Sequence, residues 1–329
     1  MAGHQVLIGM HCTPDVEAIL NDAPEEVEVT LLPEGESLGD HLSGVEILFG
    51  RLPESDFDRA EALKWVQQPS AGVEGTMYPA FQASDMVLTN CRNLYNRQIS
   101  EHAFALLLAL TRRIPNQLEF KTRKHWQRVP CVELAGLTMG IIGLGGIGRG
   151  VAERAKAFEM EVLAVDAEDL EKPAYVDQLG KLDFLPEMMS QSHVVVVCCP
   201  STPETHKMLS HDLFNRLPSH SYEGEFSGDL TLSGSFLVNV SRGKVVDEEA
   251  LIAALRSGKL AGAGLDVTYT EPCPEDSPLW TEPNVILTSH SAGSSQHVRV
   301  RAMELFVENL HRYVKGEPLV NVVDKEKGY

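Results

Sequence analysis

The chain has 329 residues, of which 43% are hydrophobic and 23% are charged, and this length is enough for about two globular domains. The formal net charge of −19 argues against a surface that binds nucleic acid or an anionic membrane. No apolar stretch reaches the length of a membrane span, and the N-terminal residues lack the basic region and cleavage pattern of a signal peptide, so we expect a cytoplasmic protein.

The cysteines give no sign of a metal site or a redox motif. None of them has C-x-x-C spacing, and we therefore interpret them as reduced core thiols and predict no metal site. The six are Cys12, Cys91, Cys131, Cys198, Cys199 and Cys273.

The first hundred residues predict a small α/β domain. Short strand-like runs occur at 5–10, 27–32, 45–50, 63–68 and 86–90, and helical or turn-rich segments separate them. A long helix is predicted at 99–114, and its apolar positions cover most of its circumference, so we expect it to be buried between domains or against a partner subunit. Within it, we interpret His102 as a structural residue bonded to a neighbour across the domain interface. Trp126, beyond this helix, is interpreted as a packing residue at a subunit interface.

Residues 137–166 predict a βαβ unit with a phosphate-binding turn. Gly143, Gly145 and Gly148 fit G-x-G-x-x-G between a strand at 137–142 and a helix, and a second strand follows at 161–165. The N-terminus of that helix would hold the phosphates of a dinucleotide. Asp166 follows Gly148 by 18 positions, where an acid accepts hydrogen bonds from a ribose 2′-OH and disfavours a 2′-phosphate. The pattern therefore predicts NAD, as NADH, in preference to NADP.

Further strands alternate with helices in the second half of the chain. Strand-like runs occur at 193–199, 236–241, 262–267 and 285–290, helical segments such as 247–258 lie between them, and a last helix spans 294–314. This alternation is typical of a doubly wound parallel sheet, so the predicted fold class is α/β.

Three chemically useful residues follow three successive strands of this half. Arg242 comes directly after the predicted strand that ends at 241, and Glu271 follows the strand that ends at 267. His290 is the last residue of the strand that ends at 290. In open α/β sheets ligands bind beyond the carboxyl ends of the strands, so these side chains are expected to share one site. Arginine can bind a carboxylate through two hydrogen bonds, and histidine beside a carboxylate can donate a proton to a reduced ketone. Taken singly, each residue could instead be a surface turn arginine, a solvated loop acid or a buried structural histidine.

Several motifs occur in an order that resembles the D-isomer-specific 2-hydroxyacid dehydrogenase family, over roughly residues 6–322. They are SAGVEG at 70–75, SEHAFALLLAL at 100–110, GLGGIGRGVAERAKAFEMEVLAVD at 143–166, PSTPETHKML at 200–209, LVNVSRGKVVDEEALIAAL at 237–255, AGAGLDVTYTEPCPEDSPLW at 261–280 and TSHSAG at 288–293. An ordered set of this kind is much more specific than any one of its motifs.

The resemblance implies a division of the chain and an activity. It implies a Rossmann-type NAD-binding domain at 100–290 and a smaller flavodoxin-like substrate domain made of 1–99 and 291–329. It also implies an NAD-dependent oxidoreductase, usually a homodimer, that transfers hydride between NADH and a small 2-oxoacid. The similarity of SAGVEG to loops of glyoxylate and hydroxypyruvate reductases favours one of those two substrates.

The resemblance also implies residue roles. Arg242 would orient the substrate carboxylate and keto oxygen, Glu271 would pair with the histidine, and His290 would be the acid/base. The backbone of Ala71 and Gly72 would clamp the substrate carboxylate. The implied cofactor contacts are Gly143, Gly145, Gly146, Ile147, Gly148, Asp166, Cys199, Pro200, Thr205, Val240, Ser241, Asp266 and Gly293.

Alternatives on the same scaffold remain open. One is an NAD sensor that resembles C-terminal-binding corepressors, and others are phosphite oxidation and phosphoglycerate oxidation. No segment after the last helix corresponds to the extra regulatory domain of many phosphoglycerate dehydrogenases, which argues against that activity. The segment 219–235 is longer than in the family and is predicted to be an exposed loop or small hairpin without a catalytic role. His193 stands where the family commonly has an acid, and we expect it to act in capping or packing.

Overall fold

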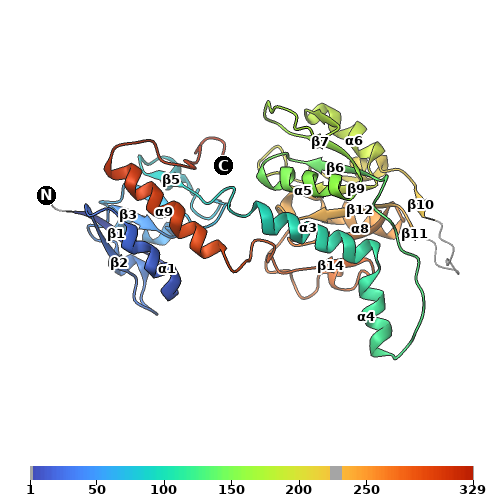
Figure 1. The fold of residues 1–329 in the computed structure, drawn as a ribbon, viewed down its shortest axis with the longest axis horizontal. Helices are drawn as coiled ribbons and strands as arrows, with labels where there is room; N and C mark the ends of the chain where they lie inside the picture. The colour runs from blue at the N-terminus through green and yellow to red at the C-terminus, as the bar shows by residue number, and fades with distance from the viewer. Residues whose placement is uncertain (1–2, 223–231, 329) are drawn as a thin grey trace. The chain divides into compact units, whose positions relative to one another are not determined.

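The computed structural model describes residues 3–222 and 232–328, and the chain separates into two compact units. Unit 1 comprises Met1–Tyr95 and Ser295–Tyr329, and unit 2 comprises Asn96–Ser294 (Figure 1). Each unit has its own parallel sheet and its own hydrophobic core. The predicted α/β fold class is therefore confirmed.

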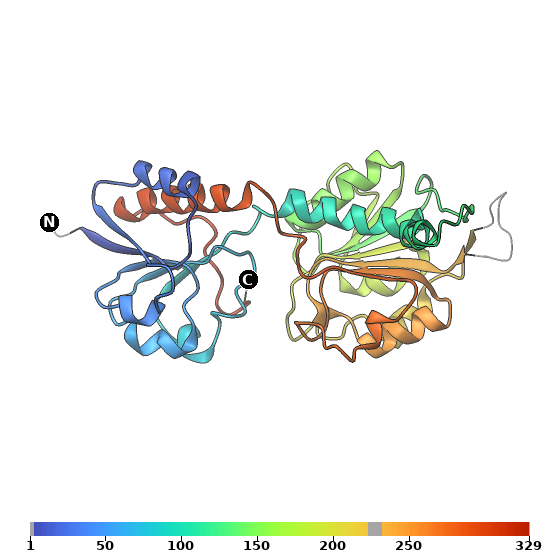
Figure 2. The same cartoon turned by 90° about the horizontal axis from the view of Figure 1, so that it is seen from below.

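Unit 1 contains a five-stranded parallel sheet in the flavodoxin-like order β2-β1-β3-β4-β5. Its strands are β1 (His4–Ile8), β2 (Val27–Leu31), β3 (Ile47–Phe49), β4 (Trp65–Gln67) and β5 (Val87–Thr89), close to the five predicted runs. Its helices are α1 (Pro14–Ile19), α2 (Pro79–Gln82) and α9 (Val298–Val314), with 3₁₀ turns at Leu20–Asp22, Leu38–His41 and Glu54–Arg59. Figure 2 shows α1 in blue and α9 in red on the same face of this sheet.

The C-terminal helix α9 is a structural part of unit 1, although the chain returns to it only after unit 2. Phe306 packs against Phe49 and Trp65, with ring centroids 4.7 and 5.4 Å apart. Asn309 on the same helix is buried and donates its side-chain amide to Gln67 at 2.9 Å. Because a buried amide must find partners, this bond fixes the position of α9 along β4.

Unit 2 contains a seven-stranded parallel sheet in the order β14-β13-β12-β9-β6-β7-β8. Its strands are β6 (Thr138–Ile142), β7 (Glu161–Val165), β8 (Gln178–Gly180), β9 (Val194–Val197), β12 (Ser235–Asn239), β13 (Leu260–Leu265) and β14 (Val285–Leu287). The chain starts in the middle at β6, runs outward through β7 and β8, and then crosses back to β9. This is the Rossmann arrangement, and β8 is the one strand of it that the sequence did not predict.

Helices cover both faces of this sheet, as the doubly wound fold requires. On one face α3 (Asn96–Thr111) and α5 (Gly146–Ala157) enclose a core that includes Leu107, Ile141 and Val151. On the other face lie α6 (Leu185–Gln191), α7 (His211–Arg216) and α8 (Glu248–Arg256), with 3₁₀ turns at Leu182–Phe184, Gly243–Val245 and Pro278–Trp280. The apolar helix predicted at 99–114 is thus buried against the sheet of its own unit. Figure 1 shows α4 (Ile114–Thr122) extending away from that sheet.

The segment predicted as an exposed loop or small hairpin does begin and end as a hairpin. β10 (Ser221–Tyr222) pairs antiparallel with β11 (Leu232–Ser233), and residues 223–231 of the predicted segment lie outside the described residues. The hairpin leads into the first residue of β12, whereas Arg242 comes after the last residue of β12. The base of the hairpin therefore lies at the end of the strand opposite to the candidate catalytic residue.

His193 packs against the base of this hairpin. Its ring stacks on that of His220 with centroids 3.7 Å apart and an interplanar angle of 15°. Its Nδ1 accepts a hydrogen bond from the backbone N–H of Thr138 at 3.1 Å. Burial, and next the neighbouring His220, lowers the pKa of His193 to about 4, and burial also lowers the pKa of His220. The stacking of its ring on that of His220 confirms the predicted packing role of His193.

The low pKa of His193 predicts a loss of stability in mild acid. The unfolded chain binds a proton near pH 6.5 and the fold resists protonation until about pH 4, so this contribution is complete above pH 6.5 and is lost as the pH falls toward 4. His193→Asn keeps an acceptor for Thr138 and removes the titration. Thermal melts at pH 7.5 and 5.0 should show a smaller acid-induced drop for this variant than for the wild type. The exposed control His125→Asn should keep the wild-type drop, and an unaltered drop in His193→Asn would contradict the assignment.

Candidate active site

The glycine turn between β6 and α5 has the three steric features that a dinucleotide turn needs. Gly143 has φ +91°, and a Cβ there would lie 2.7 Å from the Cα of Cys199. A Cβ on Gly148 would lie 2.0 Å from the carbonyl oxygen of Gly143, so only glycine lets α5 pack this closely on the turn. A Cβ on Gly145 meets no protein atom within 4 Å, and its backbone is not in the left-handed region. Gly145 is therefore the position where a side chain would cost the fold little and would obstruct only a ligand.

Asp166 follows β7 and is joined to the glycine turn. Its Oδ2 accepts the backbone N–H of Leu144 at 2.6 Å, and its Oδ1 accepts the N–H of Glu168 at 2.9 Å. The carboxylate is thus held at the carboxyl edge of the sheet beside the turn. Lys181 lies close by, since its Nζ donates to the carbonyl of Ala167 at 3.0 Å and pairs with Asp169 at 2.7 Å. Sequence reasoning missed this cation because it lies 15 positions beyond Asp166, after β8.

The other predicted cofactor residues also follow strands of unit 2 at the same edge. Cys199 and Pro200 follow β9, where the hydroxyl of Thr205 donates to the carbonyl of Pro200 at 2.8 Å. Val240 and Ser241 follow β12 and are buried. Gly146 and Ile147 begin α5, and the carbonyl of Gly293 accepts the side chain of Gln98 at 3.2 Å.

His290 and Glu271 form a hydrogen-bonded pair at this edge. Nδ1 of His290 lies 2.7 Å from Oε2 of Glu271, and the two side chains are 48% and 38% exposed in the chain. Oε1 of Glu271 accepts the N–H of Thr268 at 3.2 Å, which holds the carboxylate in place. Because Glu271 takes Nδ1, the other ring nitrogen of His290 is the one available for proton exchange with a ligand.

Arg242 follows β12, which lies beside β13, and β13 lies beside β14. The three predicted catalytic residues therefore come from three adjacent strand ends. The buried side chain of Asn239 organises the Arg242 loop, because its amide donates to the carbonyl of Arg242 at 3.0 Å and its oxygen accepts from the N–H of Ser241 at 3.1 Å. A Cβ on Gly243 would lie 1.9 Å from the carbonyl oxygen of Thr268, so the Arg242 loop packs directly on the loop that leads to Glu271.

Asp266, which is buried, and His102, which is partly exposed, belong to one polar network beside the turn at 290–292. The carboxylate of Asp266 accepts hydrogen bonds from the backbone N–H groups of Ser291 and Ala292, both at 2.9 Å. Nε2 of His102 lies 2.9 Å from the hydroxyl of Thr288. Since both residues belong to unit 2, the expectation that His102 bonds across the domain interface is wrong. It was based on the position of the helix in the sequence, which does not show which sheet the helix covers.

In unit 1 the loop after β4 contains Ala71 and Gly72. The backbone carbonyls of both residues accept hydrogen bonds within the protein. The carbonyl of Ala71 accepts one from the side-chain amide of Asn90 at 2.8 Å, and the carbonyl of Gly72 accepts one from the hydroxyl of Ser70 at 2.8 Å. Over residues 3–222 and 232–328, no hydrogen-bond acceptor is found for the backbone N–H groups of Ala71 and Gly72. The loop thus offers two adjacent donors on a half-buried backbone.

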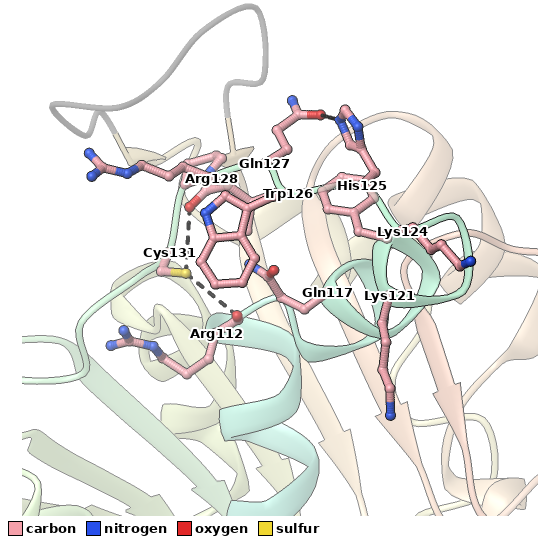
Figure 3. Close-up of a pocket in the computed structure, with 12 residues that line it drawn as sticks. Arg112, Gln117, Lys121, Lys124, His125, Trp126, Gln127, Arg128 and Cys131 are labelled. Atoms are coloured by element: carbon pink, nitrogen blue, oxygen red, sulfur yellow. Dashed lines mark hydrogen bonds between the residues drawn. The ribbon is translucent and has the colours of Figure 1, made fainter.

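The arm formed by residues 112–131 is a second distinctive surface of unit 2. It is rich in cations and carries an exposed tryptophan, since Trp126 is 100% exposed (Figure 3). Trp126 therefore does not pack against the part of the chain that the structure describes. Cys131 belongs to the same arm, and its thiol contacts the carbonyls of Arg112 at 3.5 Å and Val129 at 3.7 Å (Figure 3). The basic residues of 112–128 are Arg112, Arg113, Lys121, Arg123, Lys124 and Arg128, against the single acid Glu119.

Two further properties concern only the part of the chain that the structure describes. No helix there is long and apolar enough to cross a membrane. Within the same residues, no group of three or more His, Cys, Asp or Glu side chains could hold a metal ion.

The glycine turn and the hydrogen-bonded pair of His290 and Glu271 lie at the same edge of one Rossmann sheet, as expected in an NAD(P)-dependent oxidoreductase that acts on a CH–OH or oxo group, the class to which the family and its relatives belong. The family model described as "D-isomer specific 2-hydroxyacid dehydrogenase, NAD binding domain" matches residues 104–292. The chain therefore belongs to the D-isomer-specific 2-hydroxyacid dehydrogenase family, as its motifs predicted.

Relatives agree with this assignment over most of the chain. A glyoxylate reductase of Korarchaeum cryptofilum is 33% identical over 86% of this chain and 82% of its own. A solved family member from Aeromonas salmonicida is 30% identical, with a TM-score of 0.86 and coverage of 98% of this chain and 99% of its own. A solved NADPH-dependent glyoxylate/hydroxypyruvate reductase from Sinorhizobium meliloti, in complex with NADP and sulfate, is 27% identical, with a TM-score of 0.82 and coverage of 99% of both chains.

Two alanine substitutions in the glycine turn should separate folding from cofactor binding. Gly148→Ala forces its Cβ against the carbonyl of Gly143 and should destabilise the protein by about 1–3 kcal/mol. Gly145→Ala meets no protein atom and should leave the melting temperature unchanged, while it weakens NADH binding at least tenfold. Thermal melts and NADH fluorescence titrations measure the two effects. Unaltered NADH affinity in Gly145→Ala would show that the cofactor does not lie over this turn.

Proposed function

We propose that the protein is an NADH-dependent 2-oxoacid reductase, and in reverse a D-2-hydroxyacid dehydrogenase, for glyoxylate or hydroxypyruvate. The hydrogen-bonded pair of His290 and Glu271, 2.7 Å apart at the edge that bears the dinucleotide turn, carries this proposal. The glyoxylate reductase of Korarchaeum cryptofilum and the glyoxylate/hydroxypyruvate reductase of Sinorhizobium meliloti support the choice of substrate.

Two residues of the chain have separate roles in the proton transfer of this reaction. When bound, NADH supplies the hydride that adds to the keto carbon of the 2-oxoacid. His290 protonates the alkoxide oxygen that forms, using the ring nitrogen opposite Nδ1. Glu271 accepts the proton of Nδ1–H, so it fixes the tautomer and the orientation of the imidazole. In the oxidation direction, the same nitrogen removes the hydroxyl proton.

Substrate binding is assigned to Arg242 and to the loop of unit 1. The guanidinium of Arg242 would bind the carboxylate and polarise the keto oxygen. The backbone N–H groups of Ala71 and Gly72, which have no acceptor among the described residues, are proposed as donors to a carboxylate. We thus propose the segments 1–99 and 291–329 as the substrate domain.

Cofactor binding is assigned to the carboxyl edge of the sheet of unit 2. The proposed contacts are Gly143, Gly145, Gly146, Ile147, Gly148, Asp166, Cys199, Pro200, Thr205, Val240, Ser241 and Gly293. Asp166 favours NADH because its carboxylate would repel a 2′-phosphate. The Sinorhizobium meliloti relative is NADPH-dependent. In this chain Lys181 places one cation near Asp166, so a preference for NADH requires the repulsion of a 2′-phosphate by Asp166 to exceed its attraction to Lys181.

We also propose a homodimer that uses the arm at 112–131. Ile114, Leu118 and Trp126 are all exposed there, and a monomer rarely leaves large apolar side chains grouped in this way. The arm is basic, whereas the whole chain has a net charge of −19. The basic arm of one copy would therefore be attracted to the acidic surface of a second copy.

The activity is tested by the loss of NADH absorbance with a panel of 2-oxoacids. Wild-type protein should oxidise NADH with glyoxylate or hydroxypyruvate, and His290→Ala should lower kcat by about 10²–10⁴-fold because the proton donor is lost. His211→Ala, an exposed histidine on α7, is the matched control and should keep full activity. Bound NADH without turnover of any 2-oxoacid would overturn the proposal.

The cofactor preference is tested by Asp166→Ala. Removal of the carboxylate should lower kcat/KM with NADH about tenfold and raise kcat/KM with NADPH, which narrows the ratio of the two. Glu187→Ala, an exposed acid on α6, controls for the change in net charge. The ratio of kcat/KM for the two cofactors is the readout, and a ratio equal to that of the wild type would show that Asp166 does not set the preference.

A further inference from the structure

The backbone of His290 adopts a conformation that needs support from elsewhere. Its φ is +51°, in the left-handed region that a residue with a Cβ seldom occupies. The backbone N–H groups of His290 and of the next two residues, Ser291 and Ala292, all donate hydrogen bonds. All three donors end on one residue, Asp266.

Asp266 binds these three successive N–H groups with three different oxygens. Its carbonyl accepts from His290 at 2.8 Å. Its Oδ1 accepts from Ser291 and its Oδ2 from Ala292, both at 2.9 Å. The side chain is almost completely buried, with 2% of the residue exposed. A single carboxylate thus holds the turn that presents the imidazole to Glu271.

A second pair of residues holds the carboxylate itself. The hydroxyl of Thr288 donates to Oδ1 of Asp266 at 2.5 Å. A hydroxyl has one proton, so its oxygen must accept at its other contact, which is Nε2 of His102 at 2.9 Å. His102 is therefore protonated at Nε2 and donates to Thr288. The same nitrogen lies 3.5 Å from Oδ1 of Asp266, which adds a polar neighbour to the buried anion.

These contacts occupy most of the hydrogen-bonding capacity of the carboxylate. Oδ1 takes the hydroxyl of Thr288 and the N–H of Ser291, and Oδ2 takes the N–H of Ala292. A buried anion is tolerated only with such partners. The donors to this carboxylate are Thr288, Ser291 and Ala292, and the contact of Thr288 with His102 joins α3 to the turn at 290–292.

We propose that His102 and Thr288 are positioning residues that act through Asp266 on the catalytic His290. This inference rests on the proposed function of His290 as acid/base. Loss of either donor frees the Asp266 carboxylate to rotate, the turn at 290–292 loses its acceptors, and the imidazole moves away from Glu271. Because proton transfer depends on sub-ångström placement, the chemical step slows while cofactor binding is retained.

Paired substitutions test the inference. Thr288→Val keeps the shape of the side chain and removes the hydroxyl, and His102→Leu removes the donor on α3. Single-turnover NADH oxidation with a 2-oxoacid should slow about tenfold in both, with the Kd for NADH within about twofold of the wild-type value. His102→Gln places an amide N–H near the position of Nε2 and should recover most of the lost rate. Thr111→Val, a buried threonine on α3 whose hydroxyl bonds only to helix carbonyls, is the matched control and should keep the wild-type rate.

Crystal structures of the wild type and Thr288→Val give a readout that needs no turnover. The 2.7 Å contact between His290 and Glu271 should lengthen or break in the variant. An unaltered contact would overturn the inference, as would a lowered melting temperature with an unchanged single-turnover rate. A loss of NADH affinity as large as the loss of rate would also overturn it, in favour of a cofactor contact by Asp266. Failure of the proposed function is distinguishable, because the wild type itself would then turn over no 2-oxoacid.

Discussion

The parallel register of the sheet in unit 2 is the constraint on which the candidate site depends. Parallel strands deliver all their carboxyl ends to one edge, so the residues that follow β6, β7, β9, β12, β13 and β14 gather there. The glycine turn supplies backbone donors at the centre of this edge, and the histidine–glutamate pair lies toward its β14 side. A single architectural rule thus brings the glycine turn and the histidine–glutamate pair to one edge of one unit.

Close backbone contacts convert that general rule into a defined geometry. Gly148 allows α5 to approach the turn at Gly143, and Gly243 allows the Arg242 loop to lie against the carbonyl of Thr268. Buried polar side chains then fix the loops, with Asn239 under Arg242 and Asp266 under His290. Both are buried in unit 2, so the more exposed side chains of Arg242 and His290 follow backbone that buried polar groups hold by hydrogen bonds.

Much of the fold and the main site residues could be predicted from the sequence, because periodicity and glycine spacing are local signals. The predicted strand at 161–165 coincides with β7, and Arg242, Glu271 and His290 do follow adjacent strands. β8 was missed because its three residues, Gln178 to Gly180, contain one apolar side chain and none that is β-branched or aromatic. Lys181 was missed for the related reason that it follows that strand. His102 was given a partner in the wrong unit, because a helix that is apolar on most sides does not reveal which surface covers it.

The sequence by itself determined the α/β class and the glycine turn, since each depends on residue types at short, fixed spacings. Only the tertiary structure decided the partners of the long-range polar network. Thr288 and Asp266 lie 22 positions apart, and His102 is 186 positions before Thr288. Such contacts arise when a helix packs on a sheet, and their energy depends on burial and on distances that no local pattern encodes. For the same reason, the left-handed conformation of His290 became visible only in the folded chain.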